Sequence, residues 1–160
     1  MTETTRTIVS ACLAGAACRY DGRAKPDAEV VAAVQRGEMI PLCAEVLGDL
    51  PTPRPAAEIV GGDGSAVLDG AARVVTNTGD DVTAQFVAGA ERVANAAVAL
   101  GATHGILQDR SPSCGCGRIY DGSFSGELID GDGVTAAALT RRGLTISVRR
   151  GISAPREASA

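Results

Sequence analysis

The chain has very few aromatic side chains. Its 160 residues include two tyrosines, two phenylalanines and no tryptophan. Proteins that bind single-stranded RNA or DNA commonly stack the bases on exposed aromatic rings, so this composition argues against that class of protein. The formal net charge of −4 at pH 7 also argues against broad contact with a phosphate backbone. We therefore predict that no polymeric nucleic acid is a partner.

Long apolar runs are also missing. No stretch approaches the roughly 18 residues that a membrane-spanning helix needs, and residues 1–7 lack the apolar segment of a secretory signal peptide. We therefore predict a cytoplasmic protein that does not bind a membrane. Hydrophobic residues still make up 45% of the chain, which suffices for a packed core of Val, Ala, Leu and Ile. The length predicts one domain over 1–160, with an ordered core from about 7 to 148 and a flexible tail over 151–160.

Short apolar runs alternate with helical patterns along the chain. Buried strands are predicted at 7–13, 39–42, 104–107 and 144–148. Helices are predicted from Asp27 to Gly37, from Asp80 or Asp81 to Gly101, and over 134–140. This alternation predicts an α/β fold with a mostly parallel, Rossmann-like sheet flanked by helices.

Two kinds of segment interrupt this order. Residues 48–58 contain three prolines, which predict an ordered, extended loop. The Asp-Gly and Gly-Gly pairs within 59–78 predict a small β-ribbon, and 118–133 is another turn-rich segment. The single histidine, His104, opens a predicted buried strand and is interpreted as structural. Neither a dinucleotide fingerprint nor a P-loop lysine is found, so we expect no NAD, flavin or ATP.

The five cysteines are the most informative residues. Disulfides are rare in the cytoplasm, so metal ligation or catalysis is favoured over a disulfide framework as the role of these cysteines. Cys12 closes the first predicted strand, Cys43 directly follows the second, and Cys114 lies shortly after the third. Loops at the carboxyl ends of parallel strands meet in one crevice, so these three thiols are predicted to converge. They could hold a metal ion or an iron–sulfur cluster, or they could be buried thiols that act as small apolar side chains.

A set of ordered sequence blocks then resembles a specific bacterial family, domain of unknown function 523, whose members are known as thiouracil desulfidases. The resemblance covers about residues 7 to 148. The blocks are Ser10-Ala-Cys-Leu-Ala-Gly15, Arg19-Tyr-Asp-Gly22, Cys43-Ala-Glu45, Gly48-Asp-Leu-Pro-Thr-Pro-Arg-Pro55 with Glu58, Asp81-Val-Thr83, Ser111-Pro-Ser-Cys-Gly115, Ile119-Tyr-Asp-Gly122 and Gly131-Asp-Gly-Val-Thr135.

The resemblance implies a [4Fe–4S] cluster held by Cys12, Cys43 and Cys114, with one iron open to substrate sulfur. It also implies hydrolysis of thiolated uracil bases or nucleotides, such as 2-thiouracil and 4-thiouridine monophosphate, from C=S to C=O with release of sulfide. Carried over, the catalytic residues are Glu45 and Ser111. The open iron would be a Lewis acid, and Glu45 a general base and then acid.

Three further residues, Arg19, Arg54 and Ser113, are candidates for substrate binding. Arg54 lies between two prolines and could bind a phosphate through two N–H groups, or pair with Glu58; Arg19 has the same two interpretations. Ser113 could instead satisfy only backbone donors. Ser111 could simply cap the turn before Pro112.

The chain departs from the family pattern in three places. Cys-Ala-Glu replaces the usual Cys-Pro-Glu, Gln108-Asp109 stands where a lysine is common, and Cys18 and Cys116 are additional cysteines that we do not assign to the cluster. An alternative hypothesis from another class is a non-enzymatic protein that binds zinc or a labile cluster and acts as a sensor. The expected assembly is a monomer or small homo-oligomer.

Overall fold

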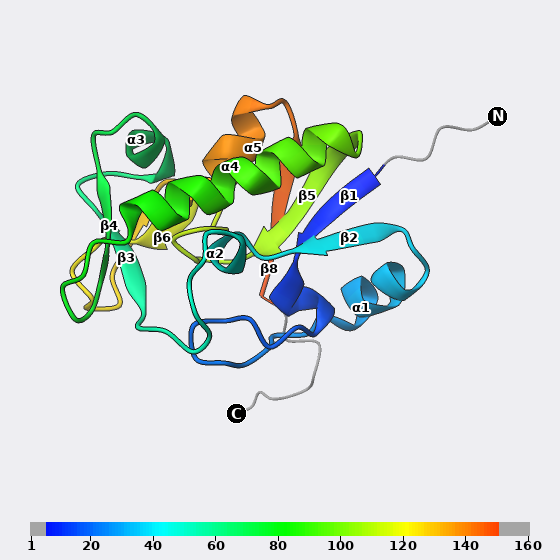
Figure 1. Cartoon of the computed structure of the whole chain (residues 1–160), viewed down its shortest axis with the longest axis horizontal. Coiled ribbons are helices and arrows are strands. Elements are labelled where there is room, and N and C mark those ends of the chain that lie inside the picture. Colours follow the sequence, from blue (N-terminus) through cyan, green and yellow to red (C-terminus); the bar gives the residue numbers. More distant parts are fainter. Residues whose placement is uncertain (1–5, 151–160) are drawn as a thin grey trace.

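The fold is built on a parallel sheet. The computed structural model describes residues 6–150. Four strands pair in the order β2-β1-β5-β8, all parallel (Figure 1). The strands are β1 (Arg6–Ser10), β2 (Met39–Leu42), β5 (Ala102–Gln108) and β8 (Thr145–Arg149). The predicted α/β fold with a mostly parallel sheet is confirmed.

Helices cover both faces of this sheet (Figure 1). Neighbouring residues of a strand point to opposite faces. Ile8 packs into the larger core cluster with α4 and α5, whereas Val9 packs against Leu13 and Val30 on the other face. The helices are η1, a 3-10 turn (Ala11–Ala14), α1 (Ala28–Gln35), α2 (Ala44–Leu47), α3 (Gly64–Leu68), α4 (Thr83–Ala99) and α5 (Val134–Arg141).

Two short antiparallel pairs extend from this layer structure. They are β3 (Ala57–Val60) with β4 (Arg73–Thr76), and β6 (Arg118–Tyr120) with β7 (Leu128–Asp130). The ribbon predicted over 59–78 is therefore present, but it encloses the unpredicted helix α3. The Asp63 side chain accepts a hydrogen bond from the Ala66 N–H at 3.0 Å, so the Asp63-Gly64 pair begins a helix and not a hairpin turn.

The first strand is shorter than predicted. The run over 7–13 is a strand only to Ser10, whose hydroxyl accepts a hydrogen bond from the Gln108 N–H at 2.9 Å. The chain then turns into η1, and Gly15 ends that turn with φ of 99°. This conformation favours glycine because a Cβ atom would be strained there. Cys12 consequently lies in a turn after the strand and not at the end of the strand itself.

Two other sequence expectations meet different outcomes. Asp27 accepts hydrogen bonds from two N–H groups of the first turn of α1, as predicted. His104 lies at the predicted place in the strand, although the residue itself is not buried. Its ring is exposed and 2.8 Å from the Thr103 hydroxyl. It lies near the amino end of β5, at the opposite end of the sheet from Cys43 and Cys114.

Helices α2 and α4 contact each other through their backbones. A Cβ atom on Gly89 would collide with the Ala44 carbonyl oxygen, and one on Gly48 would collide with the Gln85 carbonyl oxygen. Only glycine permits this approach, which holds α2, and Glu45 on it, firmly against the long helix.

The remaining expectations concern membranes and the tail. Within residues 6–150, no helix has the length and hydropathy to cross a bilayer. The tail predicted over 151–160 lies outside the described residues.

Candidate functional site

A cavity of about 440 Å³ opens at the carboxyl end of the parallel sheet. The loops that follow β1, β2 and β5 contribute its walls, as predicted from the strand order. All eight candidate residues line it: Cys12, Arg19, Cys43, Glu45, Arg54, Ser111, Ser113 and Cys114.

Cys12 lies in η1, directly after β1. Its side chain is buried, and its thiol donates a weak hydrogen bond to Gln108 Oε1 at 3.6 Å. The Cys12 carbonyl accepts a hydrogen bond from the Lys25 N–H at 3.0 Å. The turn after β1 is thereby tied both to β5 and to the segment before α1.

Cys43 connects β2 to α2. Its thiol lies 3.9 Å from the Cys18 carbonyl oxygen. Contact with the Cys18 thiol and burial raise the pKa of Cys43 well above its ordinary value. The negative charge of Glu45 also raises the pKa of Cys43.

Cys114 lies in a tight turn after β5. The Ser111 Oγ accepts hydrogen bonds from the N–H groups of Ser113 at 3.0 Å and Cys114 at 3.1 Å. The pKa of the Cys114 thiol is raised to about 12, chiefly by burial and also by the charges of Cys43 and Glu45, although contacts with Ser10 and Ser113 oppose the rise. Glu45 and all three predicted ligands line the same cavity.

Cys18 is a site residue whose position was not predicted. Hydrogen bonding to the Cys12 thiol is the largest cause that raises its pKa to about 11, although contact with Cys43 lowers it. The sequence feature that could have indicated this position is that Cys18 lies in the same loop as Cys12, just before the Arg19-Tyr-Asp-Gly22 block. Cys116 differs, because it packs against the core and its thiol contacts Asp132, outside the residues that line the cavity.

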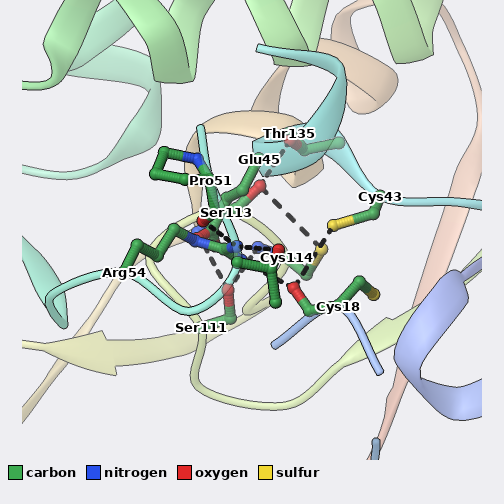
Figure 2. Close-up of polar contacts among 10 residues, drawn as sticks. Cys18, Cys43, Glu45, Pro51, Arg54, Ser111, Ser113, Cys114 and Thr135 are labelled. Atoms are coloured by element: carbon green, nitrogen blue, oxygen red, sulfur yellow. Dashed lines mark hydrogen bonds and ion pairs between the residues drawn. The ribbon is translucent and has the colours of Figure 1, made fainter. Parts of the chain in front are cut away.

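Glu45 forms an ion pair with Arg54 (Figure 2). Arg54 Nε donates to Glu45 Oε1 at 2.7 Å, Nη1 donates to the Pro51 carbonyl and the Thr52 hydroxyl, both at 3.0 Å, and Nη2 donates to the Cys18 carbonyl at 2.8 Å. Four of the five N–H groups of Arg54 are therefore used within the protein. In this arrangement no pair of N–H groups remains for two-pronged binding of a phosphate, and substrate binding by Arg54 stays a prediction.

The alternative prediction, an ion pair between Arg54 and Glu58, is wrong. Glu58 Oε1 instead accepts hydrogen bonds from the N–H groups of Gly122 at 2.9 Å and Phe124 at 3.1 Å. Glu58 thus fixes the loop between β6 and β7 beside the cavity.

The two serines of the Ser-Pro-Ser-Cys block differ in orientation. Ser111 caps the turn, as one interpretation predicted, and it also lines the cavity. Ser113 is 2% exposed, and its hydroxyl lies 2.7 Å from the Thr135 hydroxyl (Figure 2). The Ser113 hydroxyl is thus directed at α5 and supports the turn, and substrate binding by Ser113 stays a prediction.

Positive charge remains in the cavity wall. Arg19 lies 3.3 Å from Asp21 and its guanidinium contacts the Tyr20 ring, yet it is part of the wall. Lys25 also lines the cavity and makes no ion pair with any residue in 6–150. Nothing in the sequence distinguishes Lys25, because a lone lysine before a helix forms no recognisable pattern.

The donor set suits a soft, thiolate-rich group. Three thiols reach one cavity from three different loops, and thiolates are the usual ligands of iron–sulfur clusters. Within the described part of the chain, no three His, Cys, Asp or Glu side chains are arranged to hold a single metal ion.

Comparisons with known proteins agree with this site. The model of the 2-thiouracil desulfurase family matches residues 7–150. An uncharacterized protein of Bacillus subtilis (strain 168), YbbK, is 43% identical over 139 residues, which cover 87% of this chain and 92% of that protein. A solved structure of the [4Fe–4S]-dependent thiouracil desulfidase TudS has a TM-score of 0.79 and 41% identity, and the match covers 91% of each chain. The chain therefore belongs to the 2-thiouracil desulfurase family, which is a family of enzymes.

Proposed function

We propose that this protein hydrolyses thiolated uracils, converting C=S to C=O and releasing sulfide. The observation that carries the proposal is the convergence of three cysteines and one carboxylate on a single cavity at the end of the sheet. Family membership supports desulfurisation of thiouracil, and it favours an enzyme over the non-enzymatic sensor that was the alternative.

Cys12, Cys43 and Cys114 are the residues that would hold a [4Fe–4S] cluster, the cofactor of the similar desulfidase TudS. Three protein ligands leave one iron without a cysteine. When bound, the cluster supplies a Lewis acid for the substrate sulfur, which makes hydrosulfide a workable leaving group. Cys18 and Cys116 are not needed as ligands.

Glu45 is the proposed proton carrier. Its carboxylate takes a proton from a water molecule as the water oxygen bonds to the thiocarbonyl carbon. The C–S bond then breaks, and Glu45 returns the proton to the departing sulfide or to a ring nitrogen. The sum is C=S plus H₂O to C=O plus H₂S, with no net electron transfer.

Ser111 is the second proposed catalytic residue. Its oxygen already accepts two backbone N–H groups, so its own O–H proton is the atom available to a substrate in the cavity. A hydrogen bond from this proton to the uracil ring would orient the thiocarbonyl group.

The substrates that we propose are 2-thiouracil and 4-thiouridine monophosphate. Arg19 and Lys25 supply positive charge in the cavity wall that suits the phosphate of the nucleotide. We further propose that the protein acts in the cytoplasm, as a monomer or small homo-oligomer, on small molecules only.

Sulfide release tests the proposal. Protein purified without air and reconstituted with iron and sulfide should absorb near 400 nm and release sulfide from at least one of the two substrates. The Glu45→Ala variant should keep the absorbance and lose turnover. A Lys25→Met variant should raise KM for 4-thiouridine monophosphate and leave KM for 2-thiouracil unchanged. A reconstituted protein that releases no sulfide from either substrate contradicts the proposal.

A further inference from the structure

Arg54 is a buried charged residue of the site. The Arg54 side chain is 4% exposed and that of Glu45 is 18% exposed, so their ion pair is largely shielded from water. A charge in such a place is costly unless it is paired and hydrogen-bonded. Four donated hydrogen bonds meet that requirement, and they leave the Arg54 side chain with one geometry.

Those hydrogen bonds connect the carboxylate to the cysteine loop. Arg54 Nη2 donates to the Cys18 carbonyl, the same oxygen that the Cys43 thiol approaches to 3.9 Å. Arg54 also donates its backbone N–H to the Tyr20 carbonyl at 2.7 Å. Arg54 thus links Glu45 to the loop that carries Cys18, and this loop in turn contacts Cys43.

The ion pair also lines two cavities. A second cavity of about 180 Å³ is lined by Leu50, Val82 and Phe86 together with Glu45 and Arg54. Glu45 and Arg54 line the main cavity as well. Removal of the Arg54 side chain would therefore give Glu45 room to turn away from the substrate.

We infer that Arg54 is a positioning residue, which holds Glu45 Oε1 and thereby presents Oε2 to the reacting water. This inference rests on the proposed function of Glu45. Oε1 is occupied by Arg54 Nε, whereas Oε2 accepts no hydrogen bond from any side chain or backbone group in residues 6–150. Arg54 acts through Glu45 and does not touch the substrate.

Kinetics of Arg54→Met and Arg54→Lys test the inference. Loss of a group that orients a reacting or ligating side chain commonly costs 10–100-fold. We expect Arg54→Met to keep the absorbance near 400 nm, to lower kcat by roughly 10–100-fold and to change KM by less than about threefold. Arg54→Lys should restore part of kcat, because it keeps one charged donor. Arg141→Met, which removes an exposed ion pair with Asp69 far from the cavity, is the matched control and should keep full activity.

A double-mutant cycle tests whether Arg54 acts through Glu45. Arg54→Met should have no additional effect on sulfide release in the Glu45→Ala background. The same four proteins, unfolded in urea without a cluster, should show non-additive losses of stability, because either single change leaves an unpaired charge. That second measurement does not depend on activity, so it remains decisive if the wild type releases no sulfide and the proposed function fails.

Two results would overturn the inference. One is a rise in KM for 4-thiouridine monophosphate in Arg54→Met with kcat unchanged, which would make Arg54 a phosphate ligand. The other is additivity in the unfolding cycle, which would mean that the pair is not coupled.

Discussion

The Ser113 hydroxyl lies 2.7 Å from the Thr135 hydroxyl, and both side chains are almost completely buried. The Ser113 carbonyl also accepts the Thr135 N–H at 2.8 Å, and the Pro112 carbonyl accepts the Val134 N–H at 2.8 Å. The turn that carries Cys114 is thereby attached to the start of α5. The position of this thiol depends on a helix that begins twenty residues further along the chain.

Removal of one hydroxyl from this pair should destabilise the protein more than removal of both. Ser113→Ala leaves the Thr135 hydroxyl buried without a partner, at a cost of about 1–3 kcal/mol. Thr135→Val should have a similar cost. The double variant should be closer to wild type, because no unpaired polar group remains. Urea unfolding of the four cluster-free proteins measures this, and equal, additive losses would contradict it.

The backbone contact between α2 and α4 should tolerate no added methyl group. Gly89→Ala would place a Cβ atom against the Ala44 carbonyl, and overpacking of this kind commonly costs about 1–3 kcal/mol. The shift of α2 should also displace Glu45 and lower sulfide release. Gly79→Ala is the comparison variant without a steric clash, because its Cβ would meet no atom within 4 Å. Its φ of 91° means that this variant measures the cost of backbone strain alone. Full activity and stability of Gly89→Ala would show that the contact is not tight.

Single cysteine variants should divide into two groups. Alanine at Cys12, Cys43 or Cys114 should abolish the absorbance near 400 nm after reconstitution, because each removes one thiolate ligand. Cys18→Ala and Cys116→Ala should keep it. Analysis of iron and acid-labile sulfide measures the cluster content of each variant independently of the absorbance. Loss of the cluster in Cys18→Ala, with retention in one of the first three variants, would require a different ligand set.

The thiols of the cluster-free protein should react slowly with alkylating reagents. Neighbouring thiols and burial raise the pKa of Cys18 to about 11 and that of Cys114 to about 12. A higher pKa means less thiolate at a given pH, so at pH 8 Cys18 should react about 100-fold more slowly than an ordinary cysteine. Its rate should rise about tenfold per pH unit until the pH approaches 11. Peptide mass spectrometry after timed iodoacetamide treatment measures both residues, with urea-unfolded protein as the reference. Rapid modification of the folded protein at pH 7 would contradict these pKa values.

Patterns local in sequence predicted the frame of the site. The apolar runs located the four strands, and the carboxyl ends of parallel strands converge, so Cys12, Cys43 and Cys114 reach one cavity as expected. The prediction that Asp27 caps the start of α1 is confirmed for the same reason, because helix capping depends on residues close in sequence.

The contacts between loops could not be predicted in this way. Glu58 is only four residues from Arg54, yet its carboxylate is taken by the backbone of the loop after β6, 64 residues further along. Glu45 is then the acid that Arg54 pairs with. The contact between the Ser113 and Thr135 hydroxyls could not be predicted, because nothing local reveals that α5 begins against Ser113. Such pairings depend on how the elements pack and not on the spacing of residues.

The most direct test of the central claim is the origin of the oxygen in the product. Cluster-loaded protein is incubated with 2-thiouracil in H₂¹⁸O. The mass of the product uracil is measured by mass spectrometry, and the released sulfide is quantified. We expect one ¹⁸O atom in each uracil, one sulfide released for each uracil, and neither product from Glu45→Ala. Uracil that carries no ¹⁸O, or turnover that Glu45→Ala leaves unchanged, would contradict hydrolysis by a carboxylate-activated water.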